Sequence, residues 1–325
     1  MPERTRQPSE NVDTFGPAPR PAAYPPAVLL APPRRRRLLV ALLVLLVAYV
    51  GSTGLLAWRL GHRLRPAYAE PAPHLPCCSV TPLRLETDDG LHLGAWAVSP
   101  EGDDTTPVVV LVHGVNAART WVLPYIEAWT DLGAPVLAIS LRAHGDSDGD
   151  ALDFGPDLAL DVVAATRAAA ARWPGRPVVL HGISLGTSAA LHAAPSLPAR
   201  HYLLESPFLS LDRAIHNRVH RQLPAPVAAL AEHTLRAWSH VLAAHPTSAV
   251  RPVDAASRVP QDSRWWVVYG TADLLAHPDE ALAIADALPS ATPVAFPGRG
   301  HGGPFRDEAA YRAVMTAVLA AATPP

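Results

Sequence analysis

The chain has 325 residues, which gives room for one large domain with appended segments or for two small domains. Its formal net charge is −2 at pH 7, so no overall positive field favours binding to nucleic acid. The chain contains no lysine and is rich in arginine, alanine and proline, so a single arginine or proline carries less information here than usual.

Residues 1–37 predict a disordered N-terminal tail. The segment is polar and rich in proline, shows no helical or strand periodicity, and ends in four arginines at positions 34–37. Such a sequence cannot bury enough apolar surface to offset the entropy lost on ordering. We therefore expect no folded structure before residue 38.

Residues 38–59 predict a transmembrane helix. The run from Leu38 to Trp58 contains no charged residue, and its ~21 residues would span ~31 Å as a helix, which matches the hydrocarbon core of a bilayer. A helix of a soluble core would show a polar face, and this run has none. Trp58 and Arg59 close the run with residue types that anchor a helix at the membrane interface.

The arginines around this helix favour a cytoplasmic N-terminus. Arg20 and the run at 34–37 narrowly outnumber the arginines that follow the helix, so the positive-inside rule predicts a single-pass cell-membrane protein with an extracytoplasmic main domain. The alternative is a cleaved signal peptide, because residues 67–69 (Ala-Tyr-Ala) resemble a cleavage site. The apolar run is longer than a normal signal sequence, and three arginines separate it from this site, so an uncleaved anchor is favoured.

Residues 60–79 predict a linker, because they are rich in proline and lack periodicity. The chain's only cysteines, Cys77 and Cys78, lie here. Two adjacent cysteines cannot form a disulfide framework, a disulfide between them would be strained, and a zinc site needs more ligands. We interpret them as ordinary linker residues and expect the folded domain at residues 80–325.

From residue 80 the chain alternates between strands and helices, which predicts an α/β fold with a mostly parallel sheet. Residues 83–87 and 91–98 alternate apolar and polar side chains around Asp89-Gly90, as a β-hairpin does. Apolar runs typical of buried strands lie at 107–112, 136–140, 178–180, 201–205, 265–269 and 292–296. Helices are expected at 120–132, 156–173, 279–288 and 308–322.

Residues 207–262 break this alternation. They contain helical stretches and several prolines but no convincing strand. An insertion at this place lies above the C-terminal edge of the sheet, so we predict a helical cap over the site. Leu235, Trp238 and Leu242 in the cap hint at an apolar acyl or lipid group, although any cap packs its helices with such residues.

The segment 178–190 predicts a nucleophile elbow. It contains a short apolar strand, the motif Gly182-x-Ser184-x-Gly186 and a helix of small residues. A sharp strand-to-helix turn projects the serine hydroxyl above the sheet, and the two glycines leave room for that turn. The same turn directs the backbone N–H of Leu185 toward the serine. Ser184 is therefore the predicted nucleophile, and the flanking elements argue against a chance motif in a loop.

A serine hydroxyl becomes a good nucleophile only when a base takes its proton and a carboxylate orients that base. Two further positions fit these roles. Asp273 follows the strand at 265–269, and His301 lies in a glycine-rich loop after the strand at 292–296. Ser184, Asp273 and His301 all follow the C-terminal ends of strands, where open parallel sheets carry their sites. We predict these three as the catalytic residues.

Other residues that could carry chemistry receive structural roles in our interpretation. Glu205 also ends a strand and is the alternative acid, but it would have to reach across the site. Asp146 and Asp148 are expected in a structural loop. His181 precedes the elbow and is expected to pack inside the sheet.

His216 and His220 stand four residues apart on a predicted cap helix, a spacing that zinc sites also use. The glutamate of the H-E-x-x-H motif is absent, so we interpret the pair as surface histidines. The sequence also lacks a glycine-rich phosphate loop and a dinucleotide-binding fingerprint. We therefore expect no metal, no cofactor and no nucleic-acid partner.

Five motifs follow one another in the order that the α/β-hydrolase superfamily shows. They are His113-Gly114, Arg142-x-His144-Gly145-x-Ser147, Gly182-x-Ser184-x-Gly186, Gly270-x-x-Asp273 and Gly300-His301-Gly302. Residues 80–325 resemble this superfamily, particularly membrane-anchored bacterial serine hydrolases akin to its prolyl-oligopeptidase-like and serine-aminopeptidase-like members. The resemblance implies an α/β-hydrolase fold with a doubly wound sheet and a Ser184–His301–Asp273 triad. It also implies an oxyanion hole formed by the backbone N–H groups of Leu185 and Val115.

These observations predict a membrane-anchored serine hydrolase that cleaves an ester, thioester or amide through an acyl-enzyme intermediate, with an esterase or lipase favoured. A serine peptidase of the same fold is the alternative, since specificity lies in the cap. A non-catalytic binding module at the membrane is less favoured, because all three predicted catalytic residues are present. The substrate would be a small molecule, a lipid or a peptide.

Overall fold

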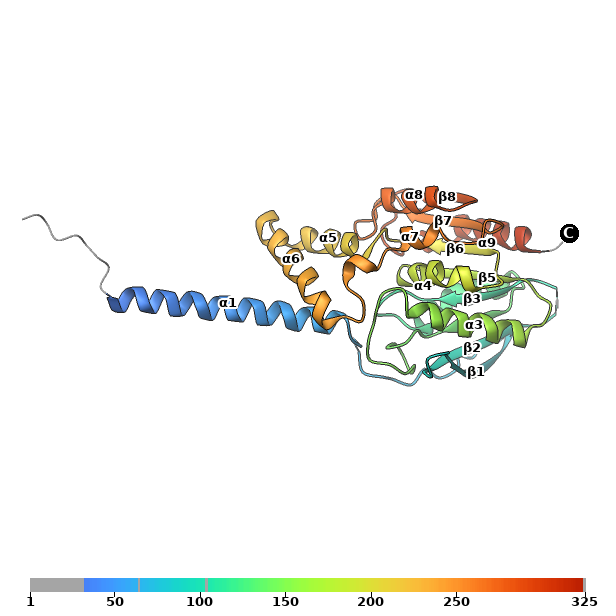
Figure 1. Ribbon diagram of the computed structural model, residues 1–325. Helices are drawn as coiled ribbons and strands as arrows, with labels where there is room; N and C mark the ends of the chain where they lie inside the picture. Colours follow the sequence, from blue (N-terminus) through green and yellow to red (C-terminus); the bar gives the residue numbers. More distant parts are fainter. Residues whose placement is uncertain (1–31, 64, 103–104, 324–325) are drawn as a thin grey trace, which may run out of the picture. The chain divides into compact units, whose positions relative to one another are not determined.

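The computed structural model describes residues 32–63, 65–102 and 105–323, and Figure 1 shows their helices and strands. The chain divides into two compact parts, residues 1–47 and residues 48–325. Helix α1, Pro32–Leu60, runs through the boundary between them. Residues 1–31 of the predicted tail lie outside the described residues.

Helix α1 begins at Pro32 rather than at residue 38, where the prediction began it. Proline is tolerated in the first turn of a helix, where its missing N–H has no intrahelical acceptor, and arginine is a good helix former. The helix therefore extends backward through the four arginines at 34–37. Its segment Arg34–Leu60 is long and apolar enough to cross a membrane by length and composition.

Among the described residues, eight strands form one sheet in the order β1-β2-β4-β3-β5-β6-β7-β8. β2 pairs antiparallel with both β1 and β4, and all other pairs are parallel. The strands are β1 Cys78–Glu86, β2 His92–Pro100, β3 Val108–Val112, β4 Val136–Ile139, β5 Val178–Ile183, β6 His201–Glu205, β7 Arg264–Gly270 and β8 Ala291–Phe296. The predicted hairpin and the mostly parallel sheet are confirmed.

The central strands are buried on both faces, as their continuous apolar sequences predicted. In β3, Val108, Val110 and Val112 pack into one hydrophobic cluster. Val109 and Leu111 pack into a second cluster on the opposite face, because successive side chains of a strand alternate. The sheet is therefore the middle layer of the domain.

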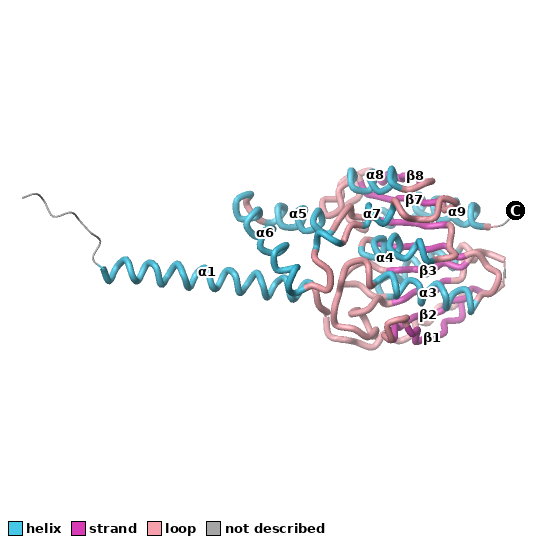
Figure 2. Tube along the Cα trace, viewed as in Figure 1, coloured by secondary structure: helices cyan, strands magenta, loops and turns pink. Residues whose placement is uncertain are grey.

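Helices cover both faces of this sheet, as Figure 2 shows for the strands drawn in magenta. One face carries α2, Leu123–Asp131, and α9, Glu308–Ala322. The other face carries α3 Leu158–Arg172, α4 Leu185–Ala193, α7 Pro252–Ala256 and α8 Pro278–Ala287. Short 3₁₀ turns lie at Arg119–Val122, Ala194–Ser196, Thr247–Ala249 and Pro304–Arg306.

The predicted cap contains two helices that pack against each other, α5, Leu211–Gln222, and α6, Ala225–Leu242. In the part of the chain that the structure describes, no strand lies between β6 and β7. The predicted cap range 207–262 also includes α7, which packs against α4 and α8. Ala255 and Ala256 of α7 are fully buried in the core, so this helix belongs to the layer on the sheet.

Helix α6 packs against the C-terminal part of α1, within the second compact part of the chain. The hydroxyl groups of Tyr49 and Thr234 are 2.9 Å apart. Gly54 faces the indole of Trp238, and a Cβ at Gly54 would lie 2.9 Å from Trp238 Cε2. Glycine is a poor helix former, and here the close approach of α6 requires it.

The described residues between α1 and β1 form no helix or strand, in agreement with a linker, but buried contacts hold them to the domain. Glu70 is 4% exposed, and its carboxylate accepts hydrogen bonds from Arg119 Nη1 at 2.8 Å and from Ser140 Oγ. Leu75 packs into the core. β1 already begins at Cys78, so the last predicted linker residues are part of the sheet.

Candidate active site

The predicted site residues gather at one edge of the sheet. β5, β7 and β8 run parallel, so their carboxyl ends meet at the same edge. Ser184 directly follows β5, Asp273 follows β7 and His301 follows β8. The fold thereby brings Ser184 and His301, which are 117 positions apart in the chain, into contact.

Ser184 occupies a strained turn between β5 and α4. Its backbone angles are φ 51° and ψ −108°, outside the regions that residues with side chains favour. The Ser184 N–H donates to Glu205 O at 2.8 Å, which holds the turn. A Cβ at Gly182 would lie 2.5 Å from Gly186 O, and one at Gly186 would lie 2.4 Å from Val112 O. Both glycines of the motif are therefore required by close backbone approach.

Ser184, His301 and Asp273 form a continuous chain of hydrogen bonds. Ser184 Oγ lies 2.9 Å from His301 Nε2, and His301 Nδ1 lies 2.8 Å from Asp273 Oδ2. A carboxylate only accepts, so Nδ1 carries the proton and donates to Asp273, which leaves Nε2 to accept from the serine hydroxyl. The imidazole is thus in the tautomer that a general base requires.

Asp273 is buried, and its carboxylate accepts several hydrogen bonds. It is 1% exposed, and its Oδ1 accepts from the backbone N–H groups of Leu275 at 2.8 Å and Ala276 at 3.0 Å. Burial alone would raise the pKa of Asp273, but the hydrogen bond from His301 and the two backbone bonds hold that pKa below its ordinary value. Asp273 is therefore ionised at neutral pH.

Two backbone N–H groups adjoin the nucleophile. Leu185 follows Ser184 directly, and Val115 lies in the loop after β3. Gly114 brings this loop close, since a Cβ at Gly114 would lie 3.3 Å from Ser184 Cβ. Within the described residues neither the Leu185 nor the Val115 N–H donates a hydrogen bond. Both donors are therefore available to an oxygen atom bound at the serine.

Two buried histidines hold the loop after β3. His113 Nδ1 donates to Gly114 O at 2.7 Å, and its Nε2 accepts from the Leu141 N–H at 3.0 Å. His144 Nε2 accepts from the Asn116 N–H at 3.2 Å. Burial lowers the pKa of His113 to about 3, so its ring stays neutral. These contacts show what His113 and His144 do, two residues of the motifs to which sequence reasoning assigned no individual role.

Glu205, the predicted alternative acid, is engaged away from the histidine. Its side chain is fully buried, and its Oε2 accepts hydrogen bonds from Tyr311 at 2.7 Å and Tyr125 at 3.0 Å. Burial raises the pKa of Glu205 to about 7, and the two tyrosine hydrogen bonds offset this only in part. Its Oε1 is buried and has no hydrogen-bond partner among the described residues.

His181 packs beneath the site, as predicted, and joins Glu205 in a buried polar network. Trp129 Nε1 donates to His181 Nδ1 at 3.1 Å, and His181 Nε2 lies 3.1 Å from Tyr311 Oη. Because Nδ1 accepts, Nε2 carries the proton and donates to Tyr311, which in turn donates to Glu205. Burial lowers the pKa of His181 to about 3, so the ring is neutral.

The loop that carries His301 depends on close backbone contacts. A Cβ at Gly270 would lie 2.1 Å from Arg299 O, so glycine is required at the end of β7. Ser206, with a φ of 53°, accepts a hydrogen bond from the Gly302 N–H at 3.2 Å. Sequence reasoning missed Ser206, because it belongs to none of the motifs.

Asp146 and Asp148 lie in the loop after β4, and both form ion pairs. Asp146 Oδ1 lies 2.6 Å from Arg119 Nη1, and Asp148 Oδ1 lies 3.2 Å from Arg84 Nη2. Arg119 is 2% exposed and also pairs with Glu70. These contacts join the loop to the segment before β1, which agrees with the structural role predicted for both aspartates.

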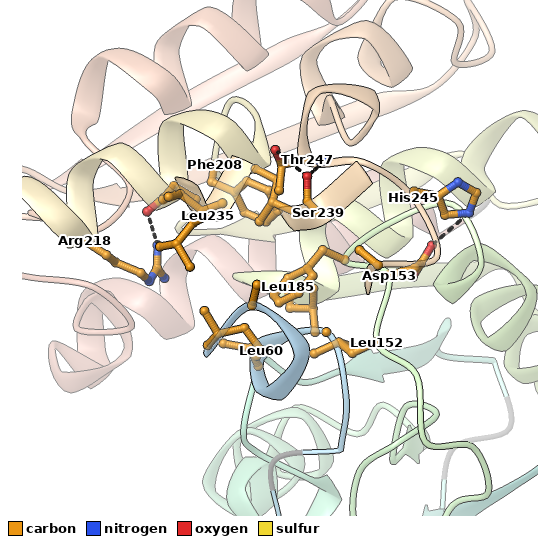
Figure 3. Close-up of a pocket in the computed structure, with 18 of the residues that line it drawn as sticks. Leu60, Leu152, Asp153, Leu185, Phe208, Arg218, Leu235, Ser239, His245 and Thr247 are labelled. Carbon is orange, nitrogen blue, oxygen red and sulfur yellow. Dashed lines mark hydrogen bonds and ion pairs between the residues drawn. The ribbon is translucent and has the colours of Figure 1, made fainter. Parts of the chain in front are cut away.

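A cavity of about 310 Å³ adjoins Ser184, and Figure 3 shows the side chains around it. Its lining is mostly apolar and comes from the end of α1, the elbow and the cap. The larger apolar side chains include Leu60, Leu152, Leu185, Phe208, Leu211 and Leu235. Of the cap residues singled out in the sequence, Leu235 lines this cavity, whereas Trp238 packs against Gly54. The cavity suits an apolar group beside the serine.

Two other clusters among the described residues place three potential metal ligands within 4.8 Å of one another. They are His216, His220 and Glu232, and Asp153, Asp157 and His245. In the first cluster His216 Nδ1 and His220 Nε2 lie 3.0 and 2.9 Å from Glu232 Oε2. The two predicted surface histidines are therefore paired with a carboxylate that links α5 to α6, and these hydrogen bonds account for their geometry.

The chain is similar to several known proteins. Residues 103–264 match the family model described as "Serine aminopeptidase, S33". The human protein ABHD12B is 29% identical over 168 residues, which are 43% of this chain and 46% of the human protein. An uncharacterised membrane protein of Saccharomyces cerevisiae is 29% identical over 135 residues, which are 41% of this chain and 47% of the yeast protein. The chain spans about half the length of these relatives.

A solved esterase shares the architecture of the folded domain. The esterase from Pyrococcus furiosus superposes with a TM-score of 0.63 and 16% sequence identity, covering 80% of this chain and 99% of the esterase. At this identity the likeness concerns the fold, and it confirms the predicted α/β-hydrolase fold. The chain therefore has the α/β-hydrolase fold, and residues 103–264 are similar to a family of serine aminopeptidases.

Proposed function

We propose that the protein is a serine hydrolase that cleaves an ester, thioester or amide through an acyl-enzyme intermediate. The observation that carries this proposal is the hydrogen-bonded chain from Ser184 through His301 to Asp273, beside a cavity that can hold the substrate. Ser184 is the nucleophile, His301 the general base and Asp273 the group that orients the base.

In the first half of the reaction His301 Nε2 takes the proton of Ser184 as Oγ attacks the carbonyl carbon. Negative charge then develops on the carbonyl oxygen, where the Leu185 and Val115 N–H groups would stabilise it by ~3–4 kcal/mol each. His301 next gives its proton to the leaving alcohol, thiol or amine, which departs and leaves an ester on Ser184. The charge of Asp273 stabilises the imidazolium that forms between these steps.

In the second half a water molecule replaces the leaving group. His301 takes a proton from the water, whose oxygen attacks the acyl carbon, and the same two N–H groups stabilise the second oxyanion. The proton then passes to Ser184 Oγ as the acid product leaves. Charge and atoms balance, and the side chains return to their starting states.

An ester is the favoured substrate over a peptide. A mostly apolar cavity of about 310 Å³ supports an acyl or alkyl group rather than a polar backbone. The match to a family described as a serine aminopeptidase supports the alternative, a peptidase. Rates on p-nitrophenyl esters against aminoacyl-nitroanilides distinguish the two, and faster release from the anilides would favour the peptidase.

The Ser184→Ala substitution tests the proposal directly. It removes the nucleophile, so we expect no labelling by a fluorophosphonate probe and a loss of ester hydrolysis on the order of 10⁴-fold or more. Ser188→Ala is the matched control: Ser188 lies on α4, one turn further along the chain, and its hydroxyl contacts Phe154 O at 2.8 Å and His192 Nδ1 at 3.5 Å rather than His301.

The control variant should keep both labelling and activity. Labelling that persists in Ser184→Ala would refute the assignment of the nucleophile. A wild-type chain that neither reacts with the probe nor hydrolyses any substrate would favour the non-catalytic binding module.

We further infer that α1 anchors the chain in the cell membrane with its N-terminus in the cytoplasm. The length and composition of Arg34–Leu60 support this, as do the exposed apolar side chains from Leu38 to Val47 and the arginines at 34–37. A relative in yeast is itself named a membrane protein. Cleavage after Ala69 would remove Leu60 from the cavity wall, which disfavours a signal peptide.

Membrane fractionation and intact mass test this anchor. The wild-type chain should stay with the membrane after alkaline carbonate extraction, and a Leu42→Arg, Leu45→Arg variant should be released, because two charges in the apolar run oppose insertion. A purified chain that lacks residues 1–69 by mass would instead indicate a cleaved signal peptide.

A further inference from the structure

One charged side chain interrupts the apolar wall of the cavity from the cap. Arg218, on α5, lines the same cavity as Ser184 and Leu235. In Figure 3 its guanidinium lies among apolar side chains, at the end of the cavity opposite His245. A guanidinium carries five N–H donors and remains charged, so its presence in such a lining calls for a partner.

Among the described residues, Arg218 has one hydrogen-bond acceptor. Arg218 Nη1 donates to Ala214 O, one turn earlier on its own helix, at 3.1 Å. No carboxylate of the described residues lies within 4.0 Å of an Arg218 nitrogen. The other N–H donors of this half-buried side chain therefore have no acceptor among the described residues.

The two carboxylates whose charge acts most on Arg218 already have other hydrogen-bond donors. Asp273 and Glu280 both favour the charged form of Arg218, but neither forms an ion pair with it. Asp273 accepts from His301 and two backbone N–H groups. Glu280 accepts from Asn217 at 2.6 Å and from the Leu209 N–H at 2.9 Å. The described part of the chain therefore offers the Arg218 guanidinium no direct counter-ion.

Holding this charge in an apolar wall has a cost. Burial lowers the pKa of Arg218 below its ordinary value, which reports the penalty of removing the guanidinium from water. An anionic group in the cavity would recover that penalty by accepting two charge-assisted hydrogen bonds from the planar guanidinium.

The opposite end of the cavity has no comparable free charge. His245 Nε2 lies 3.2 Å from Asp157 Oδ1 and 3.9 Å from Asp153 Oδ2. Asp153 also accepts from the backbone N–H groups of Gly155 and Asp157. The carboxylates at this end already have hydrogen-bond partners, whereas the guanidinium at the other end has no carboxylate partner among the described residues.

We propose that Arg218 is a specificity-determining residue that binds an acidic group of the substrate. The substrate class is then an ester with a short to medium apolar chain that also carries a carboxylate or a phosphate. This inference rests on the proposed function, because it names the substrate of the Ser184 site. Arg218 fixes the orientation of the ester without taking part in proton transfer or attack.

Matched esters that differ by one charge test the proposal on the full chain in phosphatidylcholine nanodiscs. The neutral series is p-nitrophenyl pentanoate to octanoate, and the charged series is the mono-p-nitrophenyl esters of the C5 to C8 dicarboxylic acids. For at least one length, Arg218→Gln should lower kcat/KM on the charged ester about 10- to 100-fold, mostly through KM. On the neutral ester of that length the change should stay within about 3-fold.

Arg221→Gln is the control, because Arg221 is exposed on the same helix and is not among the residues that line the cavity. It should leave both series unchanged, and the charged preference of the wild type should weaken as salt is added. If wild type and Arg218→Gln treat every charged and neutral pair alike, and both bind hexyl phosphate with the same Kd, the proposal is overturned.

Binding separates failure of this inference from failure of the proposed function. If the wild type hydrolyses no ester and does not react with a fluorophosphonate, the hydrolase proposal fails. Calorimetric titration with hexyl phosphate then tests whether Arg218 binds an anion. The anion site is supported if wild type binds hexyl phosphate at least 10-fold more tightly than Arg218→Gln does, while the two chains bind hexanol with the same Kd. Equal affinities of the two chains for hexyl phosphate refute it.

Discussion

Two carboxylates stand at the same edge of the sheet, after neighbouring parallel strands, and their surroundings move their pKa values in opposite directions. Asp273 follows β7 and is 1% exposed, and Glu205 ends β6 and is fully buried. Burial acts on both. Asp273 has the imidazole of His301 and two backbone N–H groups to offset it, whereas Glu205 has two tyrosine hydroxyls.

The comparison teaches that burial alone does not show which carboxylate is suited to orient a histidine, and that the hydrogen-bond donors around the carboxylate do. Hydrogen bonds hold the pKa of Asp273 below its ordinary value, so it is ionised and can stabilise a positive imidazole. The pKa of Glu205 is raised to about 7 by burial, so much of it is protonated at neutral pH. A protonated carboxyl cannot stabilise an imidazolium by charge.

The two groups also act on stability with opposite signs. The depressed pKa of Asp273 means that its contribution is present above its ordinary pKa and is lost as the pH falls through the folded value. The raised pKa of Glu205 means that its contribution is present below the ordinary pKa and is lost as the pH rises toward 7.

The largest expected difference between Asp273 and Glu205 is the effect of their substitution on kcat. Asp273→Asn keeps the shape of the side chain but no longer favours the tautomer in which His301 Nε2 accepts, so we expect kcat to fall ~10³- to 10⁴-fold. Glu205→Gln should change kcat by less than about 5-fold, because His301 does not bond to that side chain. Steady-state hydrolysis of one p-nitrophenyl ester measures both variants, and a reversed order would make Glu205 the orienting acid.

A second, smaller effect concerns the pH dependence of folding. Glu205 has a folded pKa of about 7 and an ordinary value of 4.5, so wild type should lose stability between pH 5 and pH 8. Glutamine does not titrate, so the free energy of unfolding of Glu205→Gln should fall by about 2 kcal/mol less over this range. Urea unfolding at the two pH values measures the difference, and parallel pH profiles would show that Glu205 does not take up a proton on folding.

A third effect, similar in size to the second, concerns the tyrosines that surround Glu205. Tyr311→Phe removes a hydrogen bond to Glu205 and the acceptor of the His181 N–H, so we expect ~1–3 kcal/mol of destabilisation with little change in kcat. Tyr125→Phe removes only one of these bonds and should cost less. Thermal unfolding of both variants at pH 7 checks the order. An unchanged stability of Tyr311→Phe would mean that water replaces its hydroxyl.

Much of this architecture was predictable because strands, turns and the nucleophile elbow depend on short local sequence patterns. The apolar run 107–112 predicted β3, and the Gly-x-Ser-x-Gly motif predicted the sharp turn at Ser184, whose φ is 51°. Motif order also predicted Asp273 and His301, which the structure brings into hydrogen-bonding distance of each other, and His301 lies within the same distance of Ser184. These features depend on residues close together in the chain or on the topology of one fold.

The remaining features depend on contacts between distant elements and left no local pattern. The residues next to Glu205 in the chain do not predict its hydrogen bonds with Tyr125 and Tyr311, which lie 80 and 106 positions away. In the sequence, Arg218 cannot be told from the other polar residues of an amphipathic helix, and only the fold shows that it lines the cavity. The start of α1 was mispredicted for a different reason, because arginine and an initial proline extend a helix without adding hydrophobicity.

The packing of Gly54 against Trp238 divides α1 into two stretches with different tolerance to exchange. From Leu38 to Val47 the side chains are exposed, so another run of similar length and hydropathy would serve equally well. From Tyr49 onward the identities matter, because Tyr49 bonds to Thr234 and any side chain at position 54 would collide with the indole. An apolar helical segment from another protein could replace the first stretch but not the second, because residues of the second stretch also line the cavity.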